Sequence, residues 1–232
     1  MKNQIPAQIY KSDVRGVLGS GNYECFSTFN FDLYQDWSRK PFGSLQVLND
    51  ETLAPQNEVT TILKENTDSI ILPLFGGIEY KDSLGNEEFI GVENFRLISA
   101  EKEMSFKLFN PYKNENVSYL QIWFDNNEQN VGTVSQQTNF NFSRRNGLIP
   151  LFEISKALGF IGIYDGREEG FYTLRNHLNG VFVFVIHGVF EVENRLLESR
   201  DGLSIKKSNT IEWEALSENA VLLVFEISLN EN

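Results

Sequence analysis

Histidine and cysteine are scarce in this 232-residue sequence. Its two histidines are His177 and His187, so residues 1–176 contain no imidazole, and its one cysteine is Cys25. A single thiol excludes an internal disulfide and any metal or redox motif that needs two cysteines. We interpret Cys25 as a small, half-buried side chain of an aromatic strand rather than a reactive thiol.

The sequence also has few positively charged residues and no long apolar run. Lysine and arginine number 20 against 32 aspartates and glutamates, which gives a formal net charge of -12 at pH 7. A surface of this sign repels phosphate backbones, so direct nucleic-acid binding is not expected. No run of about 18 apolar residues is present to span a bilayer, and the opening residues lack the apolar centre of a secretion signal. We therefore expect a cytoplasmic protein that does not enter a membrane.

Motifs for nucleophilic or phosphate chemistry are missing as well. The sequence has no GxSxG nucleophile elbow and no GxGxxG or GxxxxGK[ST] phosphate loop. Adjacent carboxylates occur at Glu87–Glu88 and Glu168–Glu169. Because neighbours on a strand point to opposite faces, we interpret both pairs as solvated charges rather than catalytic pairs. The sequence therefore predicts no catalytic residue and no cofactor.

Period-two alternation of apolar side chains is the dominant pattern that is present. Met104, Phe106 and Leu108 share one face of the segment MSFKLFN, as expected of a half-buried strand. Polar turns rich in glycine, asparagine and aspartate separate further runs of this kind, at residues 44–48, 69–75, 95–99, 117–124, 159–164, 181–187 and 220–228. Many short strands joined by polar turns predict an all-β protein built from barrels or sandwiches.

Composition and a short internal repeat divide the chain into two β units. The stretch that follows Phe124 is rich in asparagine, glutamine and serine, which predicts a long connection, and the segment LFEISKAL (151–158) is a candidate short helix. GGIEY at 76–80 is similar to GVFEV at 188–192, with glycine and glutamate at the same places. We predict one barrel at 1–124, a connecting segment at 125–157 and a second barrel at 158–232.

Several segments resemble the pirin family. They are VLNDETLAP (47–55), EYKDSLGN (79–86), RLISA (96–100) and LQIWF (120–124), in the family's order and spacing, with FSTFNF (26–31) similar to its aromatic first strand. The resemblance is good over residues 14–124, and the second half is more loosely similar to the C-terminal barrel of pirin-like quercetinases. It implies two cupin barrels, a bicupin, with an iron-type metal in the first.

The metal-ligand positions are where the sequence departs from the family. Pirins have two histidines one residue apart on a strand, and later a histidine and a glutamate with the same spacing. Counting without gaps from NDETLAP or KDSLGN places these positions at Ile62, Lys64, Phe106 and Leu108. None of the four is an ordinary metal ligand. We therefore expect no metal there, and an interior lined by these four side chains, with Lys64 reaching solvent or a carboxylate.

Three functions remain open on the sequence. The first is a bicupin without the family's metal site, which binds a small molecule or a protein partner and has no catalytic activity. The alternative is a metal-dependent oxidoreductase similar to quercetin 2,3-dioxygenase, so the enzyme question is undecided. The third is a cofactor-free hydrolase or isomerase, which a carboxylate or lysine cluster lining an open cavity would support. His177, which the repeat offset sets opposite Glu65, is a candidate polar site of the second barrel, whereas His187 is expected near the surface. The ligand, the partner and the oligomeric state are not specified.

Overall fold

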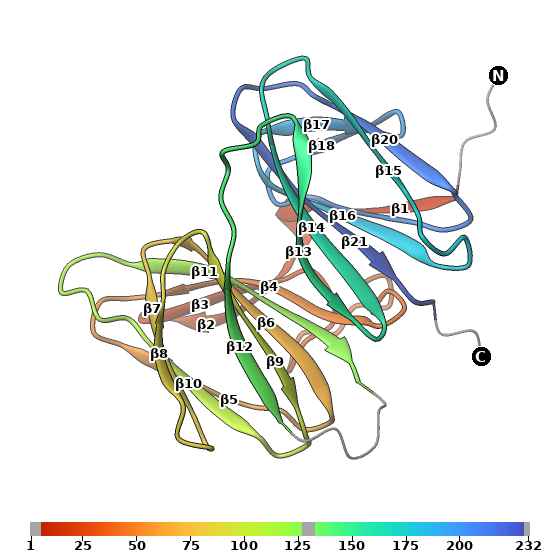
Figure 1. The fold of residues 1–232 in the computed structure, drawn as a ribbon. Coiled ribbons are helices and arrows are strands. Elements are labelled where there is room, and N and C mark those ends of the chain that lie inside the picture. Colours follow the sequence, from red (N-terminus) through yellow and green to blue (C-terminus); the bar gives the residue numbers. More distant parts are fainter. Residues whose placement is uncertain (1–5, 127–132, 230–232) are drawn as a thin grey trace. The chain divides into compact units, whose positions relative to one another are not determined.

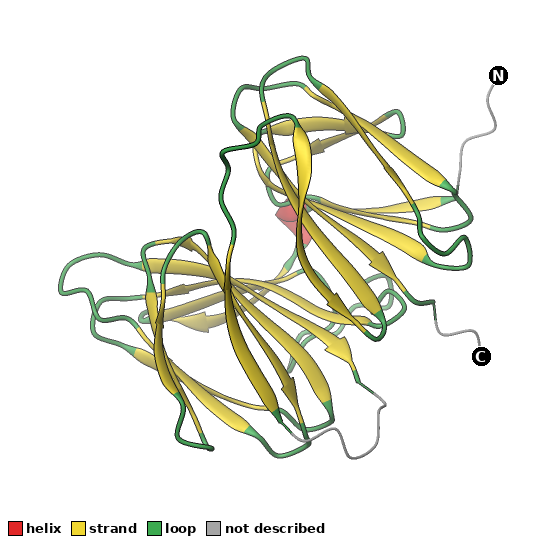
Figure 2. Ribbon diagram, in the orientation of Figure 1, coloured by secondary structure: helices red, strands yellow, loops and turns green. Residues whose placement is uncertain are grey.

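The computed structural model describes residues 6–126 and 133–229, and it contains two compact β units. The first barrel comprises Gly16–Pro41 and Leu45–Phe140, and the second barrel comprises Met1–Arg15, Phe42–Ser44 and Asn141–Asn232. Strands make up nearly all of the regular structure, and the helix in Figure 2 is the single 3-10 turn η1 (Ser12–Val14). The prediction of an all-β protein with two cupin barrels is confirmed.

The first barrel consists of a seven-stranded and a four-stranded antiparallel sheet (Figure 1). In the larger sheet the strand order is β12-β9-β6-β11-β4-β3-β2, and the smaller has the order β5-β10-β7-β8. Their bounds are β2 (Gly16–Ser20), β3 (Tyr23–Ser27), β4 (Leu45–Leu53), β5 (Glu58–Ile62), β6 (Thr67–Phe75), β7 (Ile78–Asp82), β8 (Glu87–Ile90), β9 (Asn94–Ala100), β10 (Ser105–Phe109), β11 (Val117–Asp125) and β12 (Val134–Asn139).

The second barrel repeats this plan with a six-stranded and a four-stranded sheet. The orders are β1-β19-β16-β21-β14-β13 and β15-β20-β17-β18. The bounds are β1 (Ala7–Tyr10), β13 (Gly147–Ile154), β14 (Ala157–Tyr164), β15 (Glu169–Thr173), β16 (Gly180–His187), β17 (Val189–Val192), β18 (Arg195–Glu198), β19 (Gly202–Ile205), β20 (Thr210–Ala215) and β21 (Ala220–Ile227). Among the residues that the structure describes, no helix is long and apolar enough to cross a membrane.

The two barrels are topological duplicates. β6 lies between β9 and β11, as β16 lies between β19 and β21, and the hairpin strands β7 and β17 have equivalent partners. Gly76 and Gly188 precede those hairpin strands with φ angles of +71° and +84°, a left-handed conformation that glycine adopts without strain. The short repeat seen in the sequence therefore marks equivalent turns.

The predicted boundaries need correction. Residues 125–157 were expected to form a connection with a short helix, but they contain β12, which pairs with β9, and β13, which pairs with β14. The segment 151–158 is the end of β13 and the start of β14, since eight residues without a cap do not hold a helix against sheet pairing. β1 pairs with β19 and so belongs to the second barrel, although it opens the described chain.

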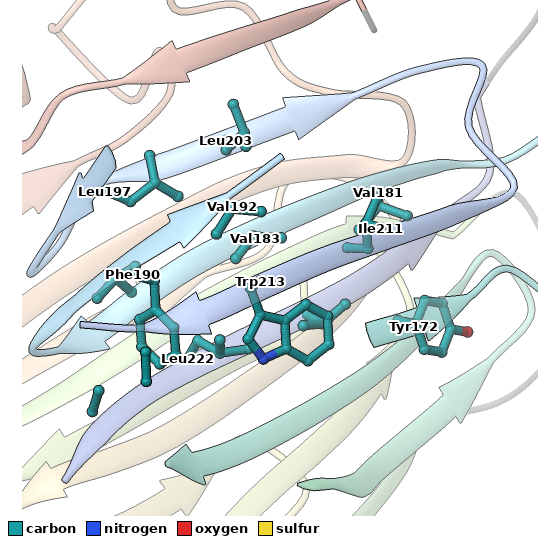
Figure 3. Close-up of a cluster of buried hydrophobic side chains, with 14 of the residues drawn as sticks. Tyr172, Val181, Val183, Phe190, Val192, Leu197, Leu203, Ile211, Trp213 and Leu222 are labelled. Carbon is teal, nitrogen blue, oxygen red and sulfur yellow. The ribbon is translucent and has the colours of Figure 1, made fainter. Parts of the chain in front are cut away.

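The second barrel has a hydrocarbon interior. Phe190, Trp213 and Leu222 lie close together in Figure 3, and they belong to one buried cluster. The rings of Tyr164 and Trp213 meet edge to face with centroids 6.0 Å apart. Burying a large apolar side chain stabilises a fold by about 1.5–3 kcal/mol, so this cluster is the main source of stability for the unit.

Candidate functional site

Phe106 and Leu108 are buried in the interior of the first barrel. They belong to an apolar cluster that includes Ile78 and Tyr80, and the Phe106 and Tyr80 rings stack with centroids 5.7 Å apart. The four-stranded sheet therefore offers a hydrocarbon wall to the interior.

Ile62 and Lys64 do not lie in that interior, which corrects the sequence register. Ile62 is 55% exposed and Lys64 is exposed, whereas Leu63 between them is 0% exposed. The inward positions counted from the family motifs are therefore wrong by one residue at this strand. A one-residue slip matters because it turns every side chain of a strand to the other face.

The inward positions of β5 follow from its pairing with β10. Thr61 lies opposite Phe106 and Val59 lies opposite Leu108, so these side chains share the inner face. The Nε2 of Gln121 on β11 donates a hydrogen bond to the Thr61 hydroxyl at 3.4 Å. Thr61 is therefore where the hydrocarbon wall meets the opposite sheet.

The opposite wall of the first barrel is polar. Inward side chains of β3, β4, β6 and β11 alternate at period two and form three rows. We call these side chains the polar wall. Its first row is Cys25, Glu51 and Tyr119, its middle row is Ser27, Asn49 and Gln121, and its third row is Ser69 and Trp123. All but the half-buried Trp123 are buried.

Glu51 is the buried carboxyl of the polar wall. Its Oε1 accepts a hydrogen bond from Asn49 Nδ2 at 3.3 Å and lies 3.9 Å from the Cys25 sulfur. Burial raises the pKa of Glu51 above its usual value, and the neighbouring polar groups of Tyr119, Asn49 and Tyr23 oppose this only in part. The site therefore favours the neutral carboxylic acid.

The other ionisable groups around Glu51 are held neutral too. Burial and the neighbouring Glu51 raise the pKa of the Cys25 thiol to about 12. The same two causes raise the pKa values of the Tyr23 and Tyr119 phenols. A thiol in this state is a poor nucleophile, which agrees with the interpretation of Cys25 as unreactive. It is, however, fully buried rather than half-buried.

Four buried polar atoms of the polar wall have no hydrogen-bond partner among the described residues. They are Asn49 Oδ1, Ser69 Oγ, Tyr119 OH and Trp123 Nε1. Native proteins pair the large majority of such atoms, and each one left unpaired costs about 1–3 kcal/mol. The second barrel contains Trp213 Nε1 in the same condition, but as a single atom inside its hydrocarbon cluster. Four on one wall call for a ligand or ordered water.

A buried arginine lies on the same inner face. In the strand register, Arg96 of β9 lies opposite Ile71 of β6, and Ile71 lies opposite Gln121 of β11. Arg96 therefore extends the middle row across the sheet, beyond the polar wall. Its guanidinium forms an ion pair with Glu88 and lies 4.1 Å from the centre of the Tyr80 ring. Its charge is therefore already neutralised by the protein.

The candidate polar site at His177 is not inside the second barrel. His177 is exposed in the turn between β15 and β16, and His187 is exposed at the end of β16. The buried polar group there is Glu226, which accepts hydrogen bonds from Tyr172 OH at 2.6 Å and from two backbone amides of the turn. Burial would raise the pKa of Glu226, but these donors lower it. Glu226 thus anchors the turn as a satisfied carboxylate.

A surface hollow lies on the outer face of the four-stranded sheet of the first barrel. It has a volume of about 670 Å³ and is lined by charged and aromatic side chains. Lys107 forms an ion pair with Glu58 at 2.7 Å, and Lys81 forms one with Glu87. Because its lysines are already paired, the hollow is a weaker candidate than the polar wall.

Comparison with known proteins relates the chain to pirins and quercetinases. The family model "Quercetinase C-terminal cupin domain" matches residues 157–227. The "Pirin-like protein YhaK" of Escherichia coli K12 is 29% identical, over 85% of this chain and 89% of that protein. The chain is thus similar to pirin-like proteins over most of its length, and its second barrel matches the quercetinase cupin model. A second relative of this bicupin, the "Quercetin 2,3-dioxygenase" of Escherichia coli K12, is 23% identical, over 92% and 95% of the two chains.

Solved structures support the same fold for this pirin-like bicupin. The crystal structure of YhhW from Escherichia coli has a TM-score of 0.88 at 20% identity and covers 98% of this chain and 100% of its own. A structure of YhhW in complex with nickel(II) has a TM-score of 0.86 and also 20% identity.

The interior of this bicupin does not fit the imidazole-rich metal site that the pirin resemblance implies. The inward residues of β5 and β10 are Val59, Thr61, Phe106 and Leu108, and Leu63 follows, so a single hydroxyl oxygen is offered. The described residues contain no group of three or more histidines, cysteines, aspartates or glutamates placed to hold a metal ion. Neither the register counted from the motifs nor the corrected one supplies an imidazole ligand.

The sequence analysis missed the polar wall. A signal was present, because Asn49 and Glu51 lie two residues apart on one strand, as do Tyr119 and Gln121 on another. Two polar residues at period two on each of two strands predict a polar inner face once the strands are known to be neighbours. Their pairing, with Glu51 opposite Tyr119, comes from the fold.

Proposed function

We propose that this bicupin binds a small molecule at the polar wall of its first barrel, without the family's metal and without catalysis. The observation that carries the proposal is the set of four unpaired, buried polar atoms on one wall, facing a hydrocarbon wall. Ligand sites combine apolar lining with a few polar groups in this way. The proposed location is the cytoplasm, and neither nucleic acid nor a membrane is a proposed partner.

A binding role fits the interior better than a protein-interaction role. A partner protein binds to exposed surface, whereas Asn49, Ser69 and Tyr119 are each 0% exposed. Only a small molecule or water enclosed within the barrel can contact groups at that depth. Regulation of a protein partner remains compatible as a consequence of ligand binding.

The test is ligand-observed NMR with a set of small polar fragments on the full-length protein, before and after treatment with a chelator. We expect fragments to bind equally in both conditions and to bind at least several-fold more weakly to Asn49→Leu, which lacks the acceptor. A wild-type protein that binds none of the fragments would overturn the proposal.

The competing function, a quercetin 2,3-dioxygenase-like oxidoreductase, is supported by the name of the 23% identical relative. Metal analysis and oxygen uptake with quercetin separate the two functions. Stoichiometric iron, nickel or copper in the purified protein, together with oxygen consumption, would favour the oxidoreductase and overturn the proposal of non-catalytic binding.

A further inference from the structure

The unpaired atoms of the polar wall specify the chemistry of a ligand, and this inference rests on the proposed function. Trp123 Nε1 can only donate a hydrogen bond and Asn49 Oδ1 can only accept one. The hydroxyls of Tyr119 and Ser69 can do either. A ligand that satisfies the wall must therefore present an acceptor to Trp123 and a donor to Asn49.

The order of these groups along the wall adds a second requirement. Tyr119 lies in the first row, Asn49 in the middle row, and Trp123 with Ser69 in the third. Successive inward rows are roughly 7 Å apart along a strand. An elongated molecule lying along the wall therefore meets the Asn49 acceptor in the middle, the Trp123 donor at one end and, at the other, the Tyr119 hydroxyl, which can donate or accept. A ligand with a donor between two acceptors satisfies all three groups.

Charge on the wall disfavours ionic ligands. An anion would lie beside Glu51, and the guanidinium of Arg96 on this inner face is already paired with Glu88, although its buried Nε–H has no partner within the part of the chain that the structure describes. A cation would require Glu51 to ionise in a site that excludes water, which is costly. An uncharged ligand meets neither difficulty.

We propose that the polar wall binds an uncharged molecule containing a secondary amide, whose N–H is donated to Asn49 between two oxygens that accept hydrogen bonds from Tyr119 and Trp123. The equivalent wall of the second barrel cannot do this. The strand in the place of β11 is β21, and its inward side chains Leu222 and Val224 belong to the hydrocarbon cluster.

Three probes that differ at one end distinguish the ligand classes. N-acetylglycinamide is neutral, N-acetylglycine is an anion at pH 7, and N-acetylethylenediamine is a cation, and all three share the acetamide group. Saturation-transfer NMR on the full-length protein measures their affinities. We expect the neutral probe to bind roughly tenfold more tightly than either ion, the difference expected from one unsatisfied or charged contact.

Variants locate the binding on the wall. Tyr119→Phe is expected to weaken binding of N-acetylglycinamide by roughly tenfold, and Trp123→Phe serves if that variant fails to fold. Tyr164→Phe, which changes a buried tyrosine of the second barrel, is the matched control and is expected to leave the affinity unchanged.

The outcomes separate the ligand class from the proposed function. If either ion binds as tightly as the neutral probe, or if Tyr119→Phe and Trp123→Phe leave its affinity unchanged, the amide inference is wrong. The same holds if other polar fragments bind and N-acetylglycinamide does not. If no fragment of any charge binds, the proposed function itself fails.

Discussion

At the scale of single residues, the hydroxyls of two buried tyrosines, Tyr119 and Tyr172, differ in their hydrogen bonding. Tyr119 OH in the first barrel has no partner, whereas Tyr172 OH in the second donates to Glu226 at 2.6 Å. An unpaired buried hydroxyl gives the free protein no stability, while a bond to a carboxylate contributes about 1.5–3 kcal/mol. The contrast agrees with the proposed role of Tyr119 in ligand binding, and it gives Tyr172 a role in stabilising the fold.

Phenylalanine at these two positions tests the contrast. We expect Tyr119→Phe to leave the free energy of unfolding within about 0.5 kcal/mol of wild type or to raise it, because the Tyr119 hydroxyl lies near Glu51 but makes no hydrogen bond of good geometry with the described residues of the free protein. Tyr172→Phe is expected to lower it by about 1.5–3 kcal/mol, since the Glu226 carboxylate loses a donor. Urea unfolding of both variants measures this. Equal losses would mean that Tyr119 OH is bonded in the free protein.

The Glu51 carboxyl predicts a pH dependence of stability. Its pKa in the folded protein is raised above the ordinary value of 4.5. Folding therefore favours the protonated form, so the wild type loses stability relative to Glu51→Gln as pH rises above about 4.5, by about 1.4 kcal/mol per pH unit up to the folded pKa.

Urea unfolding of wild type and Glu51→Gln between pH 4 and pH 8 measures this difference. The glutamine keeps the size and polarity of the side chain but does not titrate, and the neighbouring Tyr23, Cys25 and Tyr119 are common to both proteins. A difference that does not change with pH would show that Glu51 ionises in the fold as it does in water.

At the scale of secondary-structure elements, β5 shows where sequence reasoning succeeds and where it stops. The strand itself is short, ends at Ile62 and is followed by a turn that keeps Leu63 inward through backbone bonds with Met104 and Glu103. Alternation predicts that neighbouring residues face opposite ways, but it does not say which of them faces inward. That choice is made by pairing with β10, where Thr61 lies opposite Phe106.

Alanine at two adjacent positions tests the corrected register. Leu63→Ala is expected to lower the free energy of unfolding by about 2–5 kcal/mol, because it opens a cavity in the core. Ile62→Ala changes an exposed side chain and is expected to stay within about 0.5 kcal/mol of wild type. Thermal and urea unfolding compare the pair. The reverse order of losses would restore the register counted from the motifs.

Besides the pairing of β1 with β19, one buried carboxylate anchors the residues that follow β1 to the second barrel. Asp201 has a fully buried side chain that accepts hydrogen bonds from Lys11 Nζ at 2.6 Å, from Ser12 N at 2.8 Å and from Glu198 N at 3.0 Å. The contact with Lys11 raises the pKa of that lysine. This single side chain therefore connects the residues that follow β1 to the turn before β19.

Asparagine at position 201 is expected to loosen β1. Asp201→Asn removes the charge that Lys11 meets and one acceptor, so amide exchange in β1 should become faster and the free energy of unfolding should fall by about 1–3 kcal/mol. Hydrogen-exchange mass spectrometry of the β1 peptide measures the change in exchange rate. Lys81→Ala, which breaks an exposed ion pair, is the control and should leave β1 unchanged. Unaltered exchange in both variants would contradict the anchoring role.

At the scale of the whole molecule, the fold class could be predicted and the assembly of each barrel could not. Alternating apolar runs became strands β4, β6, β9, β10, β11, β14, β16 and β21, as the sequence indicated. β1 and β12 were missed because AQIY and VSQQTN show little or no apolar alternation. Each gains its strand conformation from the sheet edge that it covers, β19 or β9. Such edge strands depend on tertiary pairing rather than on local sequence.

Two fragments test the corrected domain boundaries. Residues 16–140 contain both sheets of the first barrel, whereas residues 1–124 lack β12 and carry β1 without its partner. We expect fragment 16–140 to unfold in a cooperative transition and fragment 1–124 to be less stable and prone to associate through the uncovered edge of β9. Circular dichroism melting and size-exclusion chromatography compare them. Greater stability of fragment 1–124 would support the boundary drawn from the sequence.

The pairing of β1 with β19 has a consequence for synthesis. Ala7 meets Ile205, so β1 emerges from the ribosome long before its partner strand has been translated. The first barrel has all of its strands available once β12 has left the exit tunnel, while the second cannot complete its larger sheet before β16, β19 and β21 have been made. During that interval the backbone N–H and C=O groups of β1 have no partner strand, so β1 joins the second barrel only in a late step of folding.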